Sequence, residues 1–228
     1  MISVCIATYN GHLYIKRQID SIISQIGDND EIVISDDNSS DDTIAILRSY
    51  NDSRIKIFYG NFHSPVLNFE NALKHAVGDY IILADQDDKW LAGRVQEALE
   101  LHKNGFDFVV ANVVNAYPNG LKEPRNINPI KKSFIDNLIK PRIIGCTLSF
   151  DRKVLDYVLP FPKGIAMHDI WIGLLAMKKF KCGYINNPVI EYNRHSGSFI
   201  ATHKRSIFNK LFYRLHIFYH LKKRLWKK

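Results

Sequence analysis

The sequence predicts an α/β protein with a single, mainly parallel, doubly wound sheet flanked by helices. Three observations lead to this fold class. Apolar runs of strand length alternate with segments of helical period through the first 85 residues. Three of these runs end directly in polar clusters, as a ligand site at the edge of a parallel sheet requires. The 228 residues, 46% of them hydrophobic, are enough for a domain with a real core.

The N-terminal half shows the alternation most clearly. Four apolar runs predict buried strands, at residues 2–7, 31–35, 54–59 and 80–85. The segments between them predict helices, at residues 13–26, 41–50 and 68–76. Asp41 and Asp42 would lie in the first turn of the second helix, where the helix dipole favours acidic side chains. Because parallel strands end at one edge of a sheet, the polar clusters that follow them should converge there.

The C-terminal half is less regular. Its patterns predict helices at residues 94–103, 134–139 and 170–179, and strands at residues 106–114 and 143–150. Residues 117–141 contain four prolines among many Asn and Lys residues, which indicates a long irregular region. Long loops in compact domains are usually functional or mobile.

The basic charge is concentrated in the last 25 residues. The chain has a net charge of +8, but residues 204–228 hold nine Lys or Arg and no acidic residue, so the other 203 residues have a net charge of −1. Apolar residues recur in this tail near helical spacing, which predicts an amphipathic helix that contacts anionic lipid. Nucleic-acid binding is the rival interpretation, but the apolar stripe is larger than a phosphate-contact surface needs. Packing onto the body or onto a second subunit is a third possibility.

The number of cysteines and the hydropathy of the chain indicate the cellular compartment in which the protein is found. Cys5, Cys146 and Cys182 are odd in number and widely spaced, which fits a reducing compartment better than a disulfide scaffold. The first residues resemble a strand rather than a signal peptide, and no apolar run reaches the length of a spanning helix. We therefore expect a cytoplasmic protein, held peripherally at the inner face of the cell membrane by residues 204–228.

The most informative segment is Asp85-Gln86-Asp87-Asp88, at the carboxyl end of the fourth predicted strand. Three carboxylates in four residues repel one another, so a fold keeps them together only with a cation or in a solvated turn. Carboxylates are the hard ligands that Mg²⁺ and Mn²⁺ prefer, and Mg²⁺ commonly shares them with substrate phosphates. The glycines are too far apart for a dinucleotide-binding fingerprint or a P-loop.

Five segments in register resemble family 2 glycosyltransferases of the GT-A fold, in particular bacterial polysaccharide and rhamnosyltransferase-like members. They are residues 3–10, 36–43, 78–90, 167–171 and 192–197. The resemblance covers residues 2–201. It implies a GT-A domain at 1–203, with a nucleotide-binding half at 1–92 and an acceptor-binding half at 93–203, followed by the basic amphipathic tail at 204–228.

The resemblance also implies roles in binding the donor and a metal ion. Tyr9 would stack on the nucleotide base and Asp37 would accept a hydrogen bond from it. The other donor-binding residues implied are Thr8, Asn10, Asp85 and Arg94. Asp87 would bind the Mn²⁺ or Mg²⁺ that bridges the diphosphate, and His195 would complete that site. Ordinary alternatives exist: Asp37 could cap a helix, Arg94 could be a surface residue, and a lone loop histidine is often structural.

Asp169 is the candidate catalytic base. An inverting transfer needs a carboxylate to take the proton of the acceptor hydroxyl, and an ordinary carboxylate is ionised at neutral pH. The alternative is that Asp169 only caps the helix that follows it. His168 and Trp171, in the same segment, would contact the acceptor.

The function that follows is metal-dependent, inverting transfer of a sugar. The donor would be a UDP- or dTDP-linked sugar, and the acceptor a polysaccharide or lipid-linked glycan, with no nucleic acid as partner. Two alternatives remain open: a non-catalytic module that binds nucleotide sugars or glycans, and a sugar nucleotidyltransferase, which also uses strand-end carboxylates with Mg²⁺.

Overall fold

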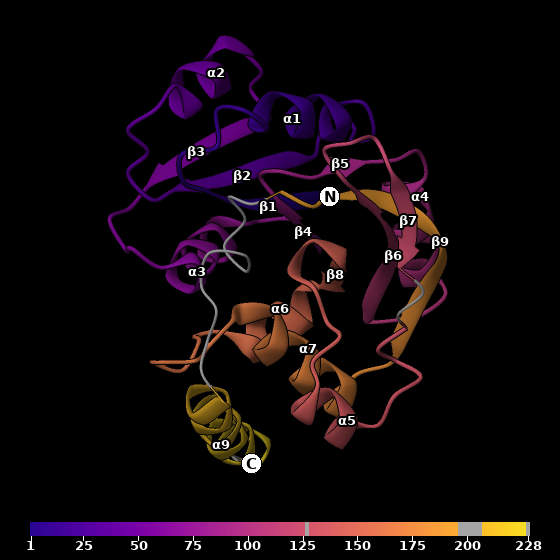
Figure 1. Cartoon of the computed structure of the whole chain (residues 1–228). Helices are drawn as coiled ribbons and strands as arrows, with labels where there is room; N and C mark the ends of the chain where they lie inside the picture. Colours follow the sequence, from indigo (N-terminus) through magenta and orange to yellow (C-terminus); the bar gives the residue numbers. More distant parts are fainter. Residues whose placement is uncertain (126–127, 196–206, 227–228) are drawn as a thin grey trace.

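A computed structural model describes residues 1–125, 128–195 and 207–226. It confirms the predicted fold class: one nine-stranded sheet with helices on both faces (Figure 1). The strand order is β3-β2-β1-β4-β8-β6-β9-β5, and β7 pairs with β6. The strands are β1 (Ile2–Thr8), β2 (Glu31–Asp36), β3 (Ile55–Tyr59), β4 (Tyr80–Asp85), β5 (Lys89–Trp90), β6 (Phe108–Ala116), β7 (Lys122–Arg125), β8 (Leu148–Asp151) and β9 (Cys182–Asn193).

The helices form a layer on each side of the sheet, and each layer encloses a hydrophobic cluster. In Figure 1, α1 and α2 lie above the N-terminal strands, whereas α3, α6 and α7 lie below. The helices are α1 (Ile15–Ile23), α2 (Thr43–Ser49), α3 (Pro65–His75), α4 (Arg94–Lys103), α5 (Phe134–Ile139), the 3₁₀ turn η1 (Gly145–Thr147), α6 (Arg152–Val158), α7 (His168–Lys179) and α9 (Ile207–Leu225).

The parallel half of the sheet is buried on both faces. β1 lies between the parallel strands β2 and β4, with Cys5 opposite Val33 and Leu83. Val4 and Ile6 pack into the cluster on the α1 side, whereas Cys5 packs into the cluster on the α3 side. Strands covered on both faces are apolar throughout instead of alternating, which is why these segments were readable in the sequence.

The C-terminal half differs from the prediction in one segment that matters for the site. Residues 143–150 were expected to be one strand, but the chain turns through η1 and β8 begins only at Leu148. The Thr147 hydroxyl donates a hydrogen bond to the Ile144 carbonyl (2.7 Å), and this local bond closes the turn. An apolar run does not reveal such a turn. β5, β7, β9 and α6 were not predicted; among them, β9 runs parallel to β6 and brings the chain back to the site edge.

Helix α9 lies against the body of the protein at its lower end in Figure 1. Ile217 and Leu221 are 2% and 1% exposed and belong to the hydrophobic core. The Arg224 guanidinium donates hydrogen bonds to the carbonyls of Tyr157, Leu159 and Pro160. One side of the predicted apolar stripe therefore packs onto the body, which was the third possibility for the tail. Residues 204–206, 227 and 228 lie outside the described part of the chain.

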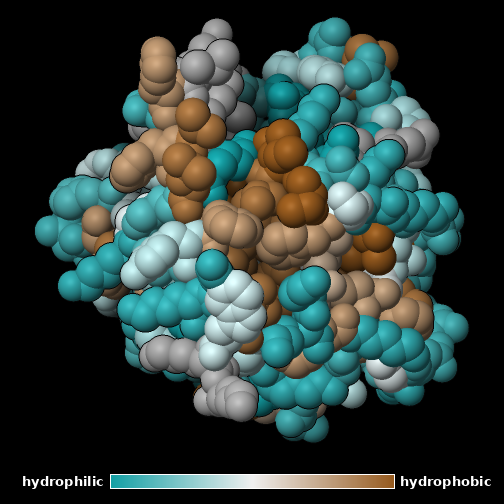
Figure 2. Space-filling model, turned by 90° about the horizontal axis from the view of Figure 1, so that it is seen from below, coloured by the Kyte–Doolittle hydropathy of each residue, from teal (hydrophilic) through white to brown (hydrophobic). Residues whose placement is uncertain are grey.

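The other side of α9 is exposed. Its apolar residues, which we call the α9 apolar face, are Phe208, Leu211, Phe212, Leu215 and Phe218, each at least 45% exposed. Figure 2, seen from below, shows apolar side chains gathered on the underside, where α9 and α5 lie in Figure 1. None of the described helices is long and apolar enough to cross a membrane.

Candidate active site

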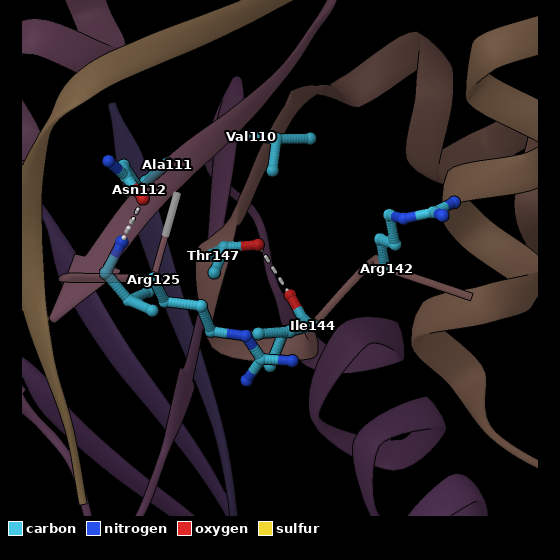
Figure 3. Close-up of a pocket in the computed structure, with 8 residues that line it drawn as sticks. Val110, Ala111, Asn112, Arg125, Arg142, Ile144 and Thr147 are labelled. Atoms are coloured by element: carbon cyan, nitrogen blue, oxygen red, sulfur yellow. Dashed lines mark hydrogen bonds between the residues drawn. The ribbon is translucent and has the colours of Figure 1, made fainter. Parts of the chain in front are cut away.

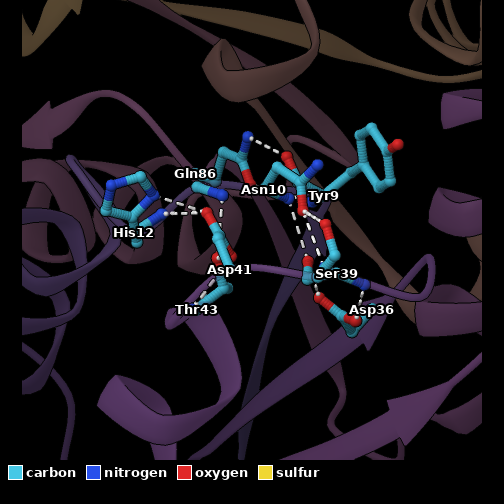
Figure 4. Close-up of polar contacts among 10 residues, drawn as sticks. Tyr9, Asn10, His12, Asp36, Ser39, Asp41, Thr43 and Gln86 are labelled. Carbon is cyan, nitrogen blue, oxygen red and sulfur yellow. Dashed lines mark hydrogen bonds and ion pairs between the residues drawn. The ribbon is translucent and has the colours of Figure 1, made fainter.

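The loop after β1 carries an exposed aromatic ring on a fixed backbone. The Tyr9 amide donates to Gln86 Oε1 and the Gln86 amide group donates back to the Tyr9 carbonyl, both at 3.0 Å (Figure 4). The Tyr9 side chain is 55% exposed. A ring that is exposed while its backbone is held on both sides is suited to stacking on a flat ligand. Sequence reasoning had not given Gln86 this role.

Asn10 and Thr8 hold this loop in its conformation through hydrogen bonds. Asn10 has a φ of 46°, a left-handed conformation that Asn adopts more readily than most residues. Its amide donates to Ser39 Oγ (2.9 Å), and its side-chain oxygen accepts from the Ser40 amide (2.9 Å). Thr8 is fully buried, and its hydroxyl donates to Asp36 (2.7 Å). Thr8 was predicted to help close the donor pocket, and because its side chain is buried, any such role is to support the loop from beneath.

A carboxylate clamp joins the same loop to α2. The His12 amide donates to Asp41 Oδ2 (3.1 Å), and the Thr43 amide donates to Asp41 Oδ1 (3.0 Å). Figure 4 shows His12 and Thr43 on either side of Asp41. Burial raises the pKa of Asp41, but hydrogen bonds from Thr43 and His12 outweigh it and lower the pKa to about 2. Asp41 therefore stays ionised and fixes the β1 loop against the start of α2.

Asp37 anchors a neighbouring loop. Its carboxylate accepts hydrogen bonds from the backbone amides of Phe62, His63 (3.1 Å) and Ser64 (3.0 Å), and the residue is only 5% exposed. The expected partner was a nucleotide base, and the expected alternative was a helix cap. The structure instead assigns this carboxylate to residues 62–64, which lead into α3.

Asp87 and His195, the two predicted metal ligands, lie in contact although 108 residues separate them. His195 Nε2 is 2.7 Å from Asp87 Oδ2. The contact arises because β9 ends beside the turn after β4, where the Asn193 amide donates to Asp88 Oδ1 (2.9 Å). The His195 ring also packs against Tyr14, with ring centroids 4.6 Å apart. Ser196 and Gly197 of the same sequence segment lie outside the described residues.

Asp85, Asp87 and Asp88, which we call the acidic centre, carry more negative charge than their protein partners balance. Burial and the charges of Asp87 and Asp169 raise the pKa of Asp85 to about 8. Burial and the charges of Asp85 and Asp87 raise the pKa of Asp88 as well. Asp88 Oδ2 is buried and has no hydrogen-bond partner among the described residues. Such a concentration of carboxylates fits a divalent cation, whose charge would compensate their mutual repulsion.

Asp169 lies in the first turn of α7, close enough to the acidic centre that its charge acts on Asp85. It is 9% exposed, and its Oδ1 accepts a hydrogen bond from the Ile170 amide (2.6 Å). Burial raises the pKa of Asp169 to about 6, against the opposing hydrogen bonds from the backbone of Ile170 and Gly145. Gly145 belongs to η1, the turn that the sequence did not predict. Asp169 thus makes a backbone contact at the start of α7, as the helix-cap alternative expects, and it also faces the acidic centre.

His168 and Trp171 do not line the site. His168 is 3% exposed and stacks on Phe69, with ring centroids 4.0 Å apart; burial lowers its pKa to about 3. Trp171 is fully buried, and its indole N–H donates to the Val158 carbonyl (2.9 Å). Their assignment as acceptor-binding residues is wrong, because both side chains point from α7 into the core while Asp169 points toward the acids.

Arg94 does not reach the donor either. It is fully buried, and its guanidinium donates to the Leu148 carbonyl at 3.2 Å and to the Cys146 carbonyl at 3.5 Å. Burial lowers its pKa to about 10. The donor-binding assignment of Arg94 is therefore wrong. Arg94 lies on the buried side of α4 together with Ala98 and His102, which follow it at intervals of four.

A small pocket lies beside η1, on the acceptor side of the predicted site. Arg125, Arg142, Ile144 and Thr147 line it together with residues 110–113 of β6 (Figure 3). In Figure 3 the Arg125 side chain passes beneath Ile144, whereas Arg142 points away toward the helices. Sequence reasoning had marked residues 117–141 only as a functional or mobile loop.

Comparisons with known proteins show which sequences and folds this chain resembles. The sequence profile of Glycosyl transferase family 2 matches residues 3–159. The chain is 34% identical over 217 residues to the Escherichia coli UDP-Glc:alpha-D-GlcNAc-diphosphoundecaprenol beta-1,3-glucosyltransferase WfaP, covering 88% of this chain and 80% of that protein. It is 29% identical over 223 residues to the Shigella flexneri dTDP-rhamnosyl transferase RfbG, covering 87% of this chain and 77% of that protein.

A solved structure shares the fold. The crystal structure of S. aureus TarS 1–349 in complex with UDP-GlcNAc superposes with a TM-score of 0.78 at 18% sequence identity. The superposition covers 99% of this chain and 66% of the TarS chain, so this protein spans about two thirds of its structural neighbour.

Proposed function

The chain belongs to glycosyl transferase family 2, and on that premise we propose that it transfers a sugar, with inversion, from a UDP- or dTDP-linked donor to a polysaccharide or lipid-linked glycan acceptor. The observation that carries the proposal is the position of Asp169. Its carboxylate lies beside the Asp85–Asp88 cluster at the carboxyl edge of the sheet. We assign the donor to residues 1–92 and the acceptor to residues 93–203.

The donor side rests on Tyr9 and the acidic centre. The exposed Tyr9 ring would stack on the nucleotide base, and Asn10, with Asp37 behind it, would hold the surrounding loops. Asp85 would face the donor ribose or sugar. Asp87 and His195 are the residues that would hold Mn²⁺ or Mg²⁺, and such an ion would neutralise charge on the departing diphosphate.

Asp169 would act on the acceptor. Its carboxylate takes the proton from an acceptor hydroxyl while that oxygen attacks the anomeric carbon, and the bond from this carbon to the diphosphate oxygen breaks on the opposite face. Attack opposite the leaving group inverts the anomeric configuration. The hydrogen bonds from Ile170 and Gly145 hold the base in place, which limits the entropy lost on reaching the transition state.

A donor panel tests the proposed function. The purified protein is incubated with UDP-hexoses and dTDP-rhamnose, Mn²⁺ or Mg²⁺, and a lipid-linked or soluble glycan acceptor. We expect a nucleoside diphosphate and an extended glycan with inverted linkage. Pyrophosphate as product would identify a nucleotidyltransferase. Binding of the donor without turnover in any combination would support the binding-module alternative.

The pH dependence of the reaction reports on the base. Asp169 must be ionised to accept a proton, and its pKa in the folded protein is about 6. We therefore expect kcat/KM to fall tenfold per pH unit below about pH 6 and to level off above it. Initial rates at subsaturating donor and acceptor between pH 4.5 and 8 measure this profile, with circular dichroism as the control for folding. A rate that is flat across this range would exclude Asp169 as the titrating base.

We also propose that the α9 apolar face contacts an anionic membrane on the cytoplasmic side. This face adjoins exposed Lys222 and Lys223, and aromatic and aliphatic side chains beside lysines favour the interface of an anionic bilayer. A lipid-linked acceptor would be found at the same surface.

Substitution tests this contact better than deletion, because deletion would also remove Ile217 and Leu221 from the core. The variant Phe208→Ser/Phe212→Ser/Phe218→Ser is expected to lose sedimentation with anionic liposomes without losing thermal stability. Leu13→Ser/Val77→Ser, which alters equally exposed apolar residues elsewhere, should bind like the wild type. Binding of the wild type to liposomes should weaken as the salt concentration rises, because salt screens the charges. The part of the binding that comes from apolar contacts should remain. If the wild type ignores liposomes and shifts on nucleic acid at physiological salt, the membrane proposal is wrong.

A further inference from the structure

Three side chains beneath the proposed donor site form a cluster that the reaction does not use as a unit. Asp85, Asp88 and Cys146 each bring one metal-ligating atom to within 4.8 Å of the other two. They come from the end of β4, from the turn after it and from η1. Asp88 and Cys146 are fully buried, whereas Asp85 is partly exposed and forms the open side of the cluster. None of the three belongs to the Asp87–His195 pair.

The spacing is close to that of a coordination site. Zinc binds a thiolate sulfur at about 2.3 Å and a carboxylate oxygen at about 2.0–2.2 Å in tetrahedral geometry, so two ligand atoms on one ion lie about 3.5 Å apart. The three ligating atoms lie within 4.8 Å of one another, so they would have to approach by up to about 1 Å when an ion binds. Side-chain rotation supplies such a change without moving the strands.

The surroundings of this cluster supply no compensating charge among the described residues. Asp88 Oδ1 accepts a hydrogen bond from the Asn193 amide, but the buried Oδ2 has no hydrogen-bond partner among the described residues. The nearby guanidinium of Arg94 donates to the carbonyls of Cys146 and Leu148, and neither Asp85 nor Asp88 forms an ion pair within the described ranges. A buried carboxylate oxygen without a partner is costly, and a bound cation would remove that cost.

We propose that Asp85, Asp88 and Cys146 form a second, inner cation site that takes thiophilic divalent ions such as Zn²⁺. One sulfur and two oxygens suit a borderline ion better than Mg²⁺, which prefers oxygen ligands alone. Binding displaces the thiol proton of Cys146 to solvent, and the thiolate sulfur then bonds to the ion. The outer pair, Asp87 and His195, remains free for the ion that accompanies the donor.

An ion in the inner site should change the rate of sugar transfer. This expectation rests on the proposed function. Asp85 would be drawn to the inner ion and away from the donor. Zn²⁺ is therefore expected to inhibit transfer in the presence of excess Mg²⁺, and Cys146→Ser should be less sensitive. Ion binding itself can be measured without any turnover, so it is tested separately from the glycosyltransferase activity.

The test uses Cd²⁺ as a spectroscopic probe on the full chain under reducing conditions. A thiolate that binds Cd²⁺ gives an ultraviolet charge-transfer band, and equilibrium dialysis gives the number of ions bound. We expect the band, with one ion per chain, in Asp87→Asn, where the outer site is disabled. Cys182→Ser, which removes a more accessible thiol, should keep the band, whereas Cys146→Ser should lose it.

Two results would overturn the inner site. One is a wild-type protein, folded by circular dichroism, that shows no sulfur band at saturating Cd²⁺; the Cys146 thiol is then only a neighbour of the acids. The other is a band that persists in Cys146→Ser. If Cys146→Ser does not fold, Asp88→Asn replaces it: the band should remain but the affinity for Cd²⁺ should fall by about tenfold or more, and an unchanged affinity would count against the site.

Discussion

Replacing Asp169 with asparagine is expected to reduce transfer by about 10² or more, the usual scale of general-base catalysis. The amide keeps the shape of the side chain and its oxygen can still accept the hydrogen bond from the Ile170 amide, so α7 should begin as before. It cannot take a proton from the acceptor hydroxyl. Donor affinity should remain within a few fold of the wild type. Steady-state kinetics with both substrates, together with calorimetry of donor binding, separate the two effects.

Asp136→Asn provides the matched control for this variant. Asp136 lies in the first turn of α5, where it forms a capping box with Ser133, and no residue proposed for the reaction belongs to this helix. Its loss should cost a little stability and no activity. If Asp169→Asn transfers sugar at the wild-type rate, Asp169 serves only the start of α7 and the base lies elsewhere. If both variants lose activity together with stability, the loss of activity comes from destabilised helices rather than from the loss of the catalytic base.

Replacing Asp87 with asparagine is expected to abolish the metal-dependent part of nucleotide diphosphate binding. The amide is a weaker ligand than the carboxylate, and changes even beyond the direct ligands commonly cost 10–100-fold in metal affinity. We therefore expect the affinity for UDP or dTDP in the presence of Mn²⁺ to fall by about 100-fold. Calorimetry with Mn²⁺ and then with EDTA measures the difference.

His195→Gln should show the same defect in a milder form, because the Asp87 carboxylate remains in place and loses only its 2.7 Å partner. Asp79→Asn is the control, since Asp79 pairs with the N-terminal amine at the opposite end of β4. Metal-dependent affinity that is unchanged in Asp87→Asn would show that the ion is held by other residues. Equal losses in Asp79→Asn and Asp87→Asn would point to a general effect of charge.

Much of the site was predictable because it follows strand ends. Tyr9 and Asp37 come directly after a buried parallel strand and Asp85 is the last residue of one, and parallel strands end at one edge. Asp87 and His195 were paired only through the resemblance to a family. Their contact depends on β9, a strand that the local pattern had not shown.

The errors have a common origin in the direction of single side chains. His168, Asp169 and Trp171 occupy four consecutive positions with Ile170, yet only Asp169 turns toward the acids while the two aromatic residues enter the core. Arg94 was predicted to bind the donor or to lie on the surface, but its place on the buried side of α4 outweighs its charge. Which side of a short helix faces the core depends on how that helix packs, and this is not a local property.

The sequence by itself determined the α/β class, the parallel half of the sheet and the edge where the acids gather, because hydrophobic period and strand order are local properties of the chain. Only the tertiary structure decided which acids lack a partner, where η1 places Gly145 and Cys146, and how α9 divides its apolar residues between core and surface. These features depend largely on contacts between residues far apart in the chain, such as Asn193 with Asp88 and Arg224 with Tyr157. Burial and charge at each position result from the whole packing arrangement, which no segment encodes alone.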